Sequence, residues 1–281
     1  MAPPNHTLSP LVKVPLTPRD NYRVTPPSGQ TLKIAHVSDT HLGLKERTVY
    51  VPTRPESSEP ITKQISSFEK FRGLLTTLQT LNPDVIIHTG DIADRQLWED
   101  RPQYEEFKAS LPDATNQGIL FYVRGNHDHY LSNSDLSELF TGFDPLPLDG
   151  SGLVPLADTQ IMLYGMDYRD NLGSKSIPDK IIQRDNEAIL IGVFHQSIKR
   201  ISRSYSANVS LTDLLPSSNE FGSVYDLLLL GHMHTNTVQQ IGECLLIDGG
   251  STLGLNVPST VGMITFSEAG SHYQRFPLWI E

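Results

Sequence analysis

Five short apolar runs, each stopping at a polar cluster, constrain the fold of this 281-residue chain more than any other feature of the sequence. Runs of this length bounded by turn-forming residues are typical of buried β-strands. The runs are LKIAHVS (32–38), DVIIHT (84–89), ILFYVR (119–124), AILIGVF (188–194) and YDLLLL (225–230). They are followed, in the same order, by DTH, GDIAD, GNHDH, HQS and GHMH. Five predicted strands therefore end in five polar turns.

Helical patterns lie between some of these strands. The clearest is 66–82, where apolar residues recur at helical spacing until Asn-Pro ends the run; 103–111 and 134–140 are shorter candidates. Strand–helix alternation predicts an α/β fold with a parallel or mixed sheet and helices on its face. The ligand site of such a sheet lies beyond the carboxyl ends of its strands, where the five polar turns would meet.

The remaining strand patterns, 152–158, 159–168, 237–242, 244–250, 261–268 and 272–280, predict a second, more antiparallel sheet packed on the first. We expect a Pro-rich N-terminal arm at 1–30, either packed on the surface or mobile, and one domain at 31–281.

Composition narrows the classes of function. The net charge of −10 argues against a broad nucleic-acid-binding face, although it permits a small basic groove. The single cysteine, Cys244, excludes an internal disulfide and favours a reducing compartment. No apolar run approaches the roughly 18–20 residues of a membrane span, and no signal peptide is evident, so we expect a cytoplasmic protein.

The polar turns contain imidazole and oxygen ligands without thiolates, a set that suits Mn²⁺, Fe or Zn²⁺ in catalytic roles. Alternation in DTH and HMH places the two named side chains of each motif on one side of an extended backbone. These side chains are more than one metal ion needs, whereas two metal ions that share a carboxylate would use nearly all of them. A pair of metal ions of this kind clamps a phosphoryl group during in-line displacement.

These five motifs, in this order and each after a strand, resemble the calcineurin-like metallophosphoesterase superfamily over residues 33–250. The resemblance implies a sandwich of two mixed β-sheets flanked by α-helices. It also implies two divalent ions, for which manganese is our preferred assignment and iron or zinc the alternatives.

The resemblance further assigns individual roles. Asp39, His41 and His234 would bind the first metal, Asn126, His195 and His232 the second, and Asp91 both. His127 would be the general acid, oriented and kept cationic by Asp94, and a metal-bridging hydroxide would be the nucleophile.

Three classes of function remain open. SDTHLG, FHQS and GHMH followed by GGST resemble SbcD-type DNA-repair nuclease subunits, which favours a nuclease-like phosphodiesterase. Against this, we expect the further DNA-binding and partner-binding regions of those proteins to be missing here, and the net charge is negative. The alternatives are a phosphodiesterase or phosphomonoesterase acting on nucleotides or cyclic nucleotides, and a scaffold that has lost catalysis. We expect a phosphoester partner, nucleic acid or nucleotide, and no membrane.

Several residues near the motifs have weaker assignments. His129 is a candidate for lining the substrate site, and Lys199, Arg200 and Arg203 either neutralise substrate phosphates or form a solvated face. The long excursion at 44–60 would set specificity at the mouth of the site. His36 and His88, inside predicted strands, are expected to be structural.

Overall fold

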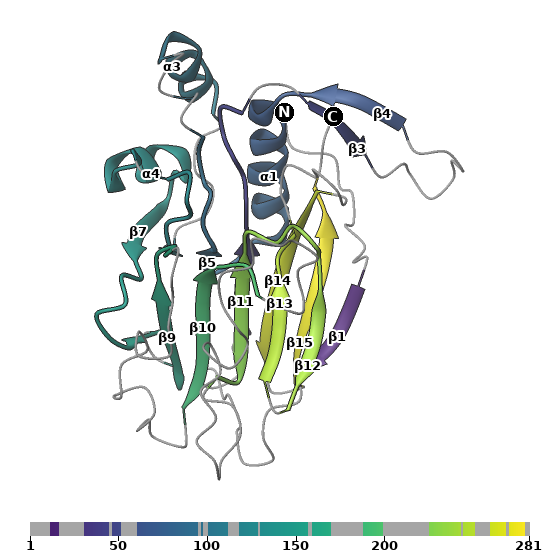
Figure 1. The fold of residues 1–281 in the computed structure, drawn as a ribbon, viewed down its shortest axis with the longest axis vertical. Helices are drawn as coiled ribbons and strands as arrows, with labels where there is room; N and C mark the ends of the chain where they lie inside the picture. Colours follow the sequence, from purple (N-terminus) through teal and green to yellow (C-terminus); the bar gives the residue numbers. More distant parts are fainter. Residues whose placement is uncertain are drawn as a thin grey trace.

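The computed structural model describes residues 12–16, 31–44, 47–51, 61–94, 97, 101–111, 118–128, 130–156, 159–169, 188–198, 225–242, 244–250, 259–267 and 270–278. Two β-sheets dominate this part of the chain, and they are packed face to face (Figure 1). The predicted α/β sandwich of two mixed sheets is therefore confirmed.

The larger sheet has seven strands in the order β1-β15-β14-β2-β5-β6-β7. Strands β2, β5, β6 and β7 are parallel, whereas β14, β15 and β1 pair antiparallel. Their bounds are β1 Val12–Leu16, β2 Leu32–Val37, β5 Val85–His88, β6 Gly118–Tyr122, β7 Phe143–Pro147, β14 Thr260–Ser267 and β15 Gly270–Pro277.

The smaller sheet has six strands in the order β12-β13-β11-β10-β9-β8. The four central strands are parallel, and the two edge strands are antiparallel to their neighbours. Their bounds are β8 Val154–Pro155, β9 Ile161–Met166, β10 Ile189–His195, β11 Leu227–Gly231, β12 Val238–Ile241 and β13 Cys244–Asp248.

The distribution of strands between the sheets differs from the expectation. The five motif strands do not share one sheet: β2, β5 and β6 lie in the larger sheet, and β10 and β11 lie in the smaller one. Strands β14 and β15, expected in the second sheet, extend the first through pairing of β14 with β2. Strand β14 has apolar residues on both faces, Val261 and Met263 on one and Ile264 and Phe266 on the other, so its hydrophobic pattern alone does not specify the partner strand.

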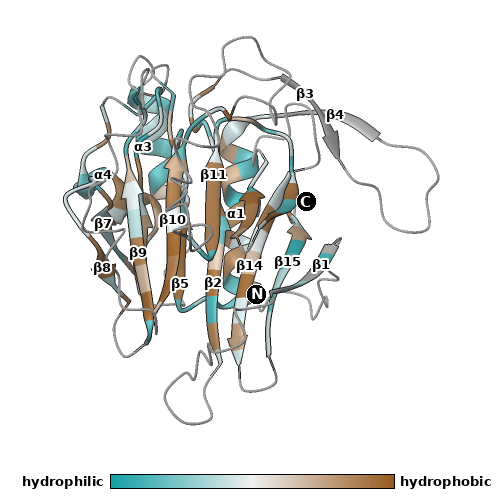
Figure 2. Ribbon diagram, turned by 60° about the horizontal axis from the view of Figure 1, so that its bottom comes forward, coloured by the Kyte–Doolittle hydropathy of each residue, from teal (hydrophilic) through white to brown (hydrophobic). Residues whose placement is uncertain are grey.

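The core between the sheets explains why the strand runs are almost continuously apolar. Ile34, Ile87 and Phe121 from the larger sheet pack with Ile191 and Leu229 from the smaller one, and all are buried. Figure 2 shows β10 and β11 as mostly hydrophobic along their length.

Helices cover the outer face of the larger sheet. Helix α1 (Ser67–Leu81) buries Phe71, Leu74 and Leu78 in a second apolar cluster with residues of β2, β5 and β6. Its N-terminus has a capping box, in which Ser66 and Glu69 each accept a hydrogen bond from the other's backbone N–H. Helices α3 (Arg101–Ala109) and α4 (Asn133–Leu139) contribute to the same cluster. None of the helices in the described part combines the length and apolar character of a membrane span.

Two segments lie at the margins of the sandwich. Strand β1, inside the predicted 1–30 arm, pairs with β15 as an edge strand of the larger sheet. Strand β3 (Arg47–Val51), inside the 44–60 excursion, pairs with β4 (Ile61–Ile65) in a separate two-stranded sheet that stands apart from the two larger sheets (Figure 1). The domain boundary at residue 30 and the role of the excursion stay predictions.

Candidate active site

The site lies where the carboxyl ends of strands from both sheets meet. The turns after β2 and β5 continue the pairing of those strands: the backbone N–H of Asp39 donates to the Gly90 carbonyl over 3.1 Å, and that of His41 to the Asp91 carbonyl over 2.9 Å. The turn after β11 joins them across the sandwich, because the backbone N–H of His232 donates to the Asp39 carboxylate over 3.1 Å. Residues almost 200 positions apart therefore share one centre.

Glycines at or after the ends of two strands, Gly125 and Gly231, allow this close approach. A Cβ on Gly125 would lie 2.1 Å from Asp91 Oδ1, and one on Gly231 would lie 2.3 Å from the Thr89 carbonyl oxygen. A side chain at either position would therefore push the strand ends apart.

The backbone of the predicted ligands is unusual. Seven described residues other than glycine have a positive φ, and five of them are predicted metal ligands. These five are Asp39 (52°), His41 (40°), Asp91 (53°), His232 (80°) and His234 (53°). Left-handed backbone at such residues costs about 1–3 kcal/mol each and clusters at functional sites. The turns therefore hold these side chains in a geometry that local preference would not select.

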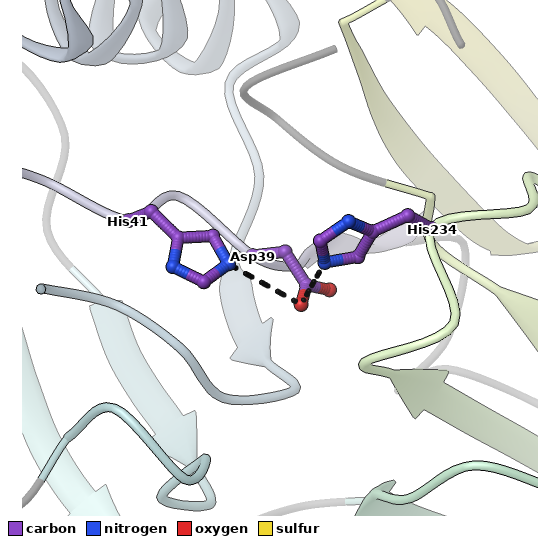
Figure 3. Close-up of side chains that lie close together, drawn as sticks. All are labelled: Asp39, His41 and His234. Atoms are coloured by element: carbon purple, nitrogen blue, oxygen red, sulfur yellow. Dashed lines mark hydrogen bonds and ion pairs between the residues drawn. The ribbon is translucent and has the colours of Figure 1, made fainter. Parts of the chain in front are cut away.

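The first group of side chains comprises Asp39, His41 and His234 (Figure 3). Nε2 of His234 lies 2.8 Å from Oδ1 of Asp39, and Nε2 of His41 lies 3.9 Å from the same oxygen. One potential ligand atom from each residue lies within 4.8 Å of the others, which is close enough to bind one ion.

The second group comprises Asp91, His195 and His232. Nε2 of His195 lies 3.2 Å from Oδ2 of Asp91 and 3.2 Å from Nδ1 of His232. The opposite nitrogen of His195, Nδ1, lies 2.7 Å from the Thr89 carbonyl, which can only accept. A proton on Nδ1 satisfies that carbonyl and leaves the Nε2 lone pair directed at the group, which is the arrangement of a metal-binding histidine.

Asp91, which is counted in the second group, also faces the first group. Its Oδ1 accepts the backbone N–H of His127 over 2.9 Å, which fixes the carboxylate. Its Oδ2 lies 3.2 Å from Nε2 of His195, in the second group, and 3.5 Å from Nε2 of His41, in the first. The same oxygen thus faces both groups.

Unsatisfied polar atoms support a metal at this place. Oδ1 of Asn126 and both ring nitrogens of His41 are buried and have no hydrogen-bond partner in the described part of the chain. Buried polar atoms are rarely left unpaired, and an amide oxygen and an imidazole nitrogen are suitable metal ligands. The donor set therefore fits divalent cations.

The electrostatics are those of a cation site. Burial opposes the charged form of His195, but the contact with Asp91 outweighs it and raises the pKa of His195 to about 9. Burial also opposes the charged form of Asp39, which by itself would raise the pKa of this carboxyl. His234 and the other nearby histidines outweigh burial and hold the pKa of Asp39 below its usual range. The buried carboxylates thus favour positive charge, and a metal ion would supply it in place of protons.

His127 stands beside the two groups and is exposed, and with His41 and Asp91 it forms a third set whose potential ligand atoms lie within 4.8 Å of one another. Its side chain is 40% exposed, and Nδ1 lies 3.2 Å from Oδ2 of Asp94. The hydrogen bond that His127 donates to Asp94 raises the pKa of His127 and lowers that of the Asp94 carboxyl. The geometry leaves Nε2 for a substrate, as the predicted role requires, although Nδ1 of His41 also lies 3.7 Å from the same Asp94 oxygen.

The residues beneath the centre support its turns. His36 and His88 are buried, and burial lowers the pKa of each to about 3, so both are neutral. The Thr40 hydroxyl donates to the Ile92 carbonyl, so His88 donates from Nε2 to Thr40 and accepts the Gly90 N–H at Nδ1. These contacts agree with the expected structural role of His88, which stays a prediction.

One neighbour of the centre was missed from the sequence. The Tyr168 ring lies 5.5 Å from that of His232 and 6.1 Å from that of His195, measured between centroids. Tyr168 lies two residues beyond the end of β9, so the rule that polar residues after strand ends form the site would have identified it. The candidates His129, Lys199, Arg200 and Arg203 lie outside the described residues.

Comparisons with known proteins agree with this geometry. The family model described as calcineurin-like phosphoesterase matches residues 32–236. A search of curated proteins found no match. Similar solved structures include a putative 5′-nucleotidase from Staphylococcus aureus (TM-score 0.53, 13% identity, 90% of this chain and 55% of that one). Another is a 5′-nucleotidase precursor from Thermus thermophilus (TM-score 0.51, 14% identity, 89% and 55%).

The chain spans about half the length of these two structures, and identities this low establish the fold alone. The closer resemblance to SbcD-type nuclease subunits is not shown by these comparisons and stays a prediction. The family itself is shown, since its model matches most of the chain. The chain belongs to the calcineurin-like phosphoesterase family.

Proposed function

We propose that the protein hydrolyses phosphodiester bonds at a dinuclear centre, with nuclease-like substrates and with manganese as the preferred metal. The observation that supports this most directly is the position of Asp91 Oδ2, which faces His41 on one side and His195 on the other. One shared carboxylate oxygen between two ligand groups is what a two-metal clamp needs.

The ligand assignments follow from the two groups. Asp39, His41 and His234 would hold the first ion, Asn126, His195 and His232 the second, and Asp91 would contact both. When bound, the ions supply a nucleophile by lowering the pKa of water, and they neutralise charge on the phosphoryl group.

The remaining steps belong to side chains that do not bind metal. In its cationic form, His127 holds one proton at Nδ1 against Asp94 and the other at Nε2, where it can be donated to the leaving oxygen. Because the ring is half-exposed, a substrate can reach Nε2 while Asp94, almost fully buried, keeps the ring oriented. Asn126 provides a neutral ligand that adds no further negative charge near the phosphate.

A second candidate is hydrolysis of nucleotides, as phosphomonoesters or as small diesters. Its support is the shared fold with two structures named as 5′-nucleotidases. One fold hosts many substrates, so the choice rests on an assay. A scaffold without catalysis is less well supported, because the seven proposed ligands and His127 are all present.

The test compares substrates on one preparation of the full chain with Mn²⁺. We would measure hydrolysis of bis-p-nitrophenyl phosphate, p-nitrophenyl phosphate, labelled single-stranded DNA, cyclic AMP and 5′-AMP. The proposal expects cleavage of the diester and of DNA, abolished by a chelator and restored by Mn²⁺. Cleavage of 5′-AMP with DNA untouched would favour the second candidate, and a chelator-resistant activity would contradict both.

A further inference from the structure

The segment that contains His234 has an unusual backbone. His232, His234 and Asn236 alternate with Met233 and Thr235 and have φ values of 80°, 53° and 56°. Three left-handed residues at every second position do not form by local preference, because a Cβ disfavours this region. Such a segment persists where surrounding contacts determine it.

Asp248, at the end of β13, supplies one set of these contacts. Its Oδ2 accepts the backbone N–H of Thr235 over 2.7 Å and also the Thr235 hydroxyl. Its Oδ1 accepts the backbone N–H of Gly250 over 3.0 Å. The side chain is fully buried, so both oxygens are committed to fixing the residue next to His234.

Arg275, on β15 of the other sheet, supplies a second set. It donates to the Asn236 carbonyl over 2.6 Å and to the Asp248 carbonyl over 3.1 Å. A third donor of the guanidinium, Nε, lies 3.2 Å from the Tyr273 hydroxyl. Arg275 is 4% exposed, and its donors thus join the smaller sheet to the larger one at the His234 segment.

The segment also has no room to relax toward β13. A Cβ on Gly250 would lie 1.8 Å from Oδ1 of Asn236, so the Asn236 side chain lies directly against the backbone of Gly250. We name Asp248 and Arg275 together the Asp248–Arg275 clamp.

We propose that the Asp248–Arg275 clamp is a positioning device that sets the affinity of the first metal site through His234. The inference rests on the proposed dinuclear centre and deepens it. The clamp reaches His234 through the backbone of Thr235 and Asn236. His232 is held independently, because it follows β11 directly and its N–H donates to the Asp39 carboxylate. The second site should therefore depend less on the clamp.

Asp248→Asn is the variant that should disturb the clamp most. Each carboxylate oxygen accepts a backbone N–H, so either orientation of the amide would set its NH₂ against one of them. Thr235→Val is a milder second variant, which keeps the side-chain shape and the backbone N–H but removes the hydroxyl donor. The matched control is Asp226→Asn: Asp226 also accepts a backbone N–H, from Leu190 over 2.8 Å, but lies at the opposite end of β11.

Mn²⁺ would be titrated calorimetrically into the metal-free full chain, with denaturant unfolding to verify that each variant is folded. We expect two sites in the unmodified protein, about tenfold weaker binding at one site in Asp248→Asn, a smaller loss of the same site in Thr235→Val, and unchanged binding in Asp226→Asn. Unchanged affinities in both clamp variants, or equal weakening of both sites, would overturn the inference while the dinuclear centre stands. Fewer than two sites in the unmodified protein would overturn the proposed centre and this inference together.

Discussion

Asp128 is expected to stabilise the site turns more than any other carboxylate that does not bind metal. Its Oδ1 accepts the backbone N–H groups of Ile92 and Ala93 over 2.8 and 3.0 Å, and its Oδ2 accepts that of Gly125 over 2.8 Å. The side chain is 2% exposed. It thus joins the turn after β5 to the turn after β6.

The size of the effect follows from these three bonds. Asp128→Ala leaves three buried N–H groups without an acceptor, at about 1–3 kcal/mol each. Because water can enter the space left by the carboxylate, we expect the lower part of the sum, a loss of about 3–5 kcal/mol in the free energy of unfolding. Asp128→Asn keeps an oxygen for Ile92 and Ala93 and sets its NH₂ against Gly125, so it should cost about 1–3 kcal/mol.

The assay is urea unfolding of each variant in the presence of a chelator, so that changes in metal binding do not contribute. Asp144→Asn, an exposed aspartate on β7, is the control and should change stability by less than about 0.5 kcal/mol. Equal stability of Asp128→Ala and the unmodified protein, or an Asn variant less stable than the Ala variant, would refute the reasoning.

Three further predictions concern the chemistry. His127→Ala should lose most of the hydrolytic activity while two metals stay bound in elemental analysis; a parallel loss of metal would contradict its assignment as the acid. Asp91→Ala should lose metal and activity together, because one oxygen faces both groups, and retention of both ions would exclude the shared ligand. Asp94 raises the pKa of His127. The cationic form of His127, which is the proposed acid, is present below this pKa and is lost as the pH rises through it. Asp94→Asn should therefore move the alkaline limb of the kcat–pH profile to lower pH, and an unmoved limb would argue against His127 as the titrating acid.

Much of the site could be predicted because its residues follow strands that are locally encoded. Val85–His88 is a mostly apolar run followed two residues later by Gly90, and Leu227–Gly231 is an apolar run that ends at glycine. The polar residues after both runs were expected to converge. The structure brings Asp39, His41, Asp91, His195, His232 and His234 together as predicted, while their roles as ligands stay a proposal. The helix at 67–81 could be predicted equally well, since the spacing of its apolar residues and its capping residues are local features of the sequence.

The assignment of strands to the two sheets could not be predicted from local sequence in this way. Strand β14 was expected in the second sheet, but it pairs with β2, more than 220 residues earlier in the chain. An apolar run can pair with many others, and the partner is chosen by packing over the whole domain. The contact of Arg275 with the His234 segment depends on that choice and gave no signal in the sequence.

The sequence by itself determined which residue types stand at the strand ends, and hence the chemistry of the centre, because strands, turns and motifs are set by neighbouring residues. Only the tertiary structure decided that the centre spans two sheets, that Asp91 presents one oxygen to both groups, and that buried Arg275 joins the sheets beside His234. The physical reason is that these features arise from pairing and burial between segments far apart in the chain, where no local pattern fixes the partner.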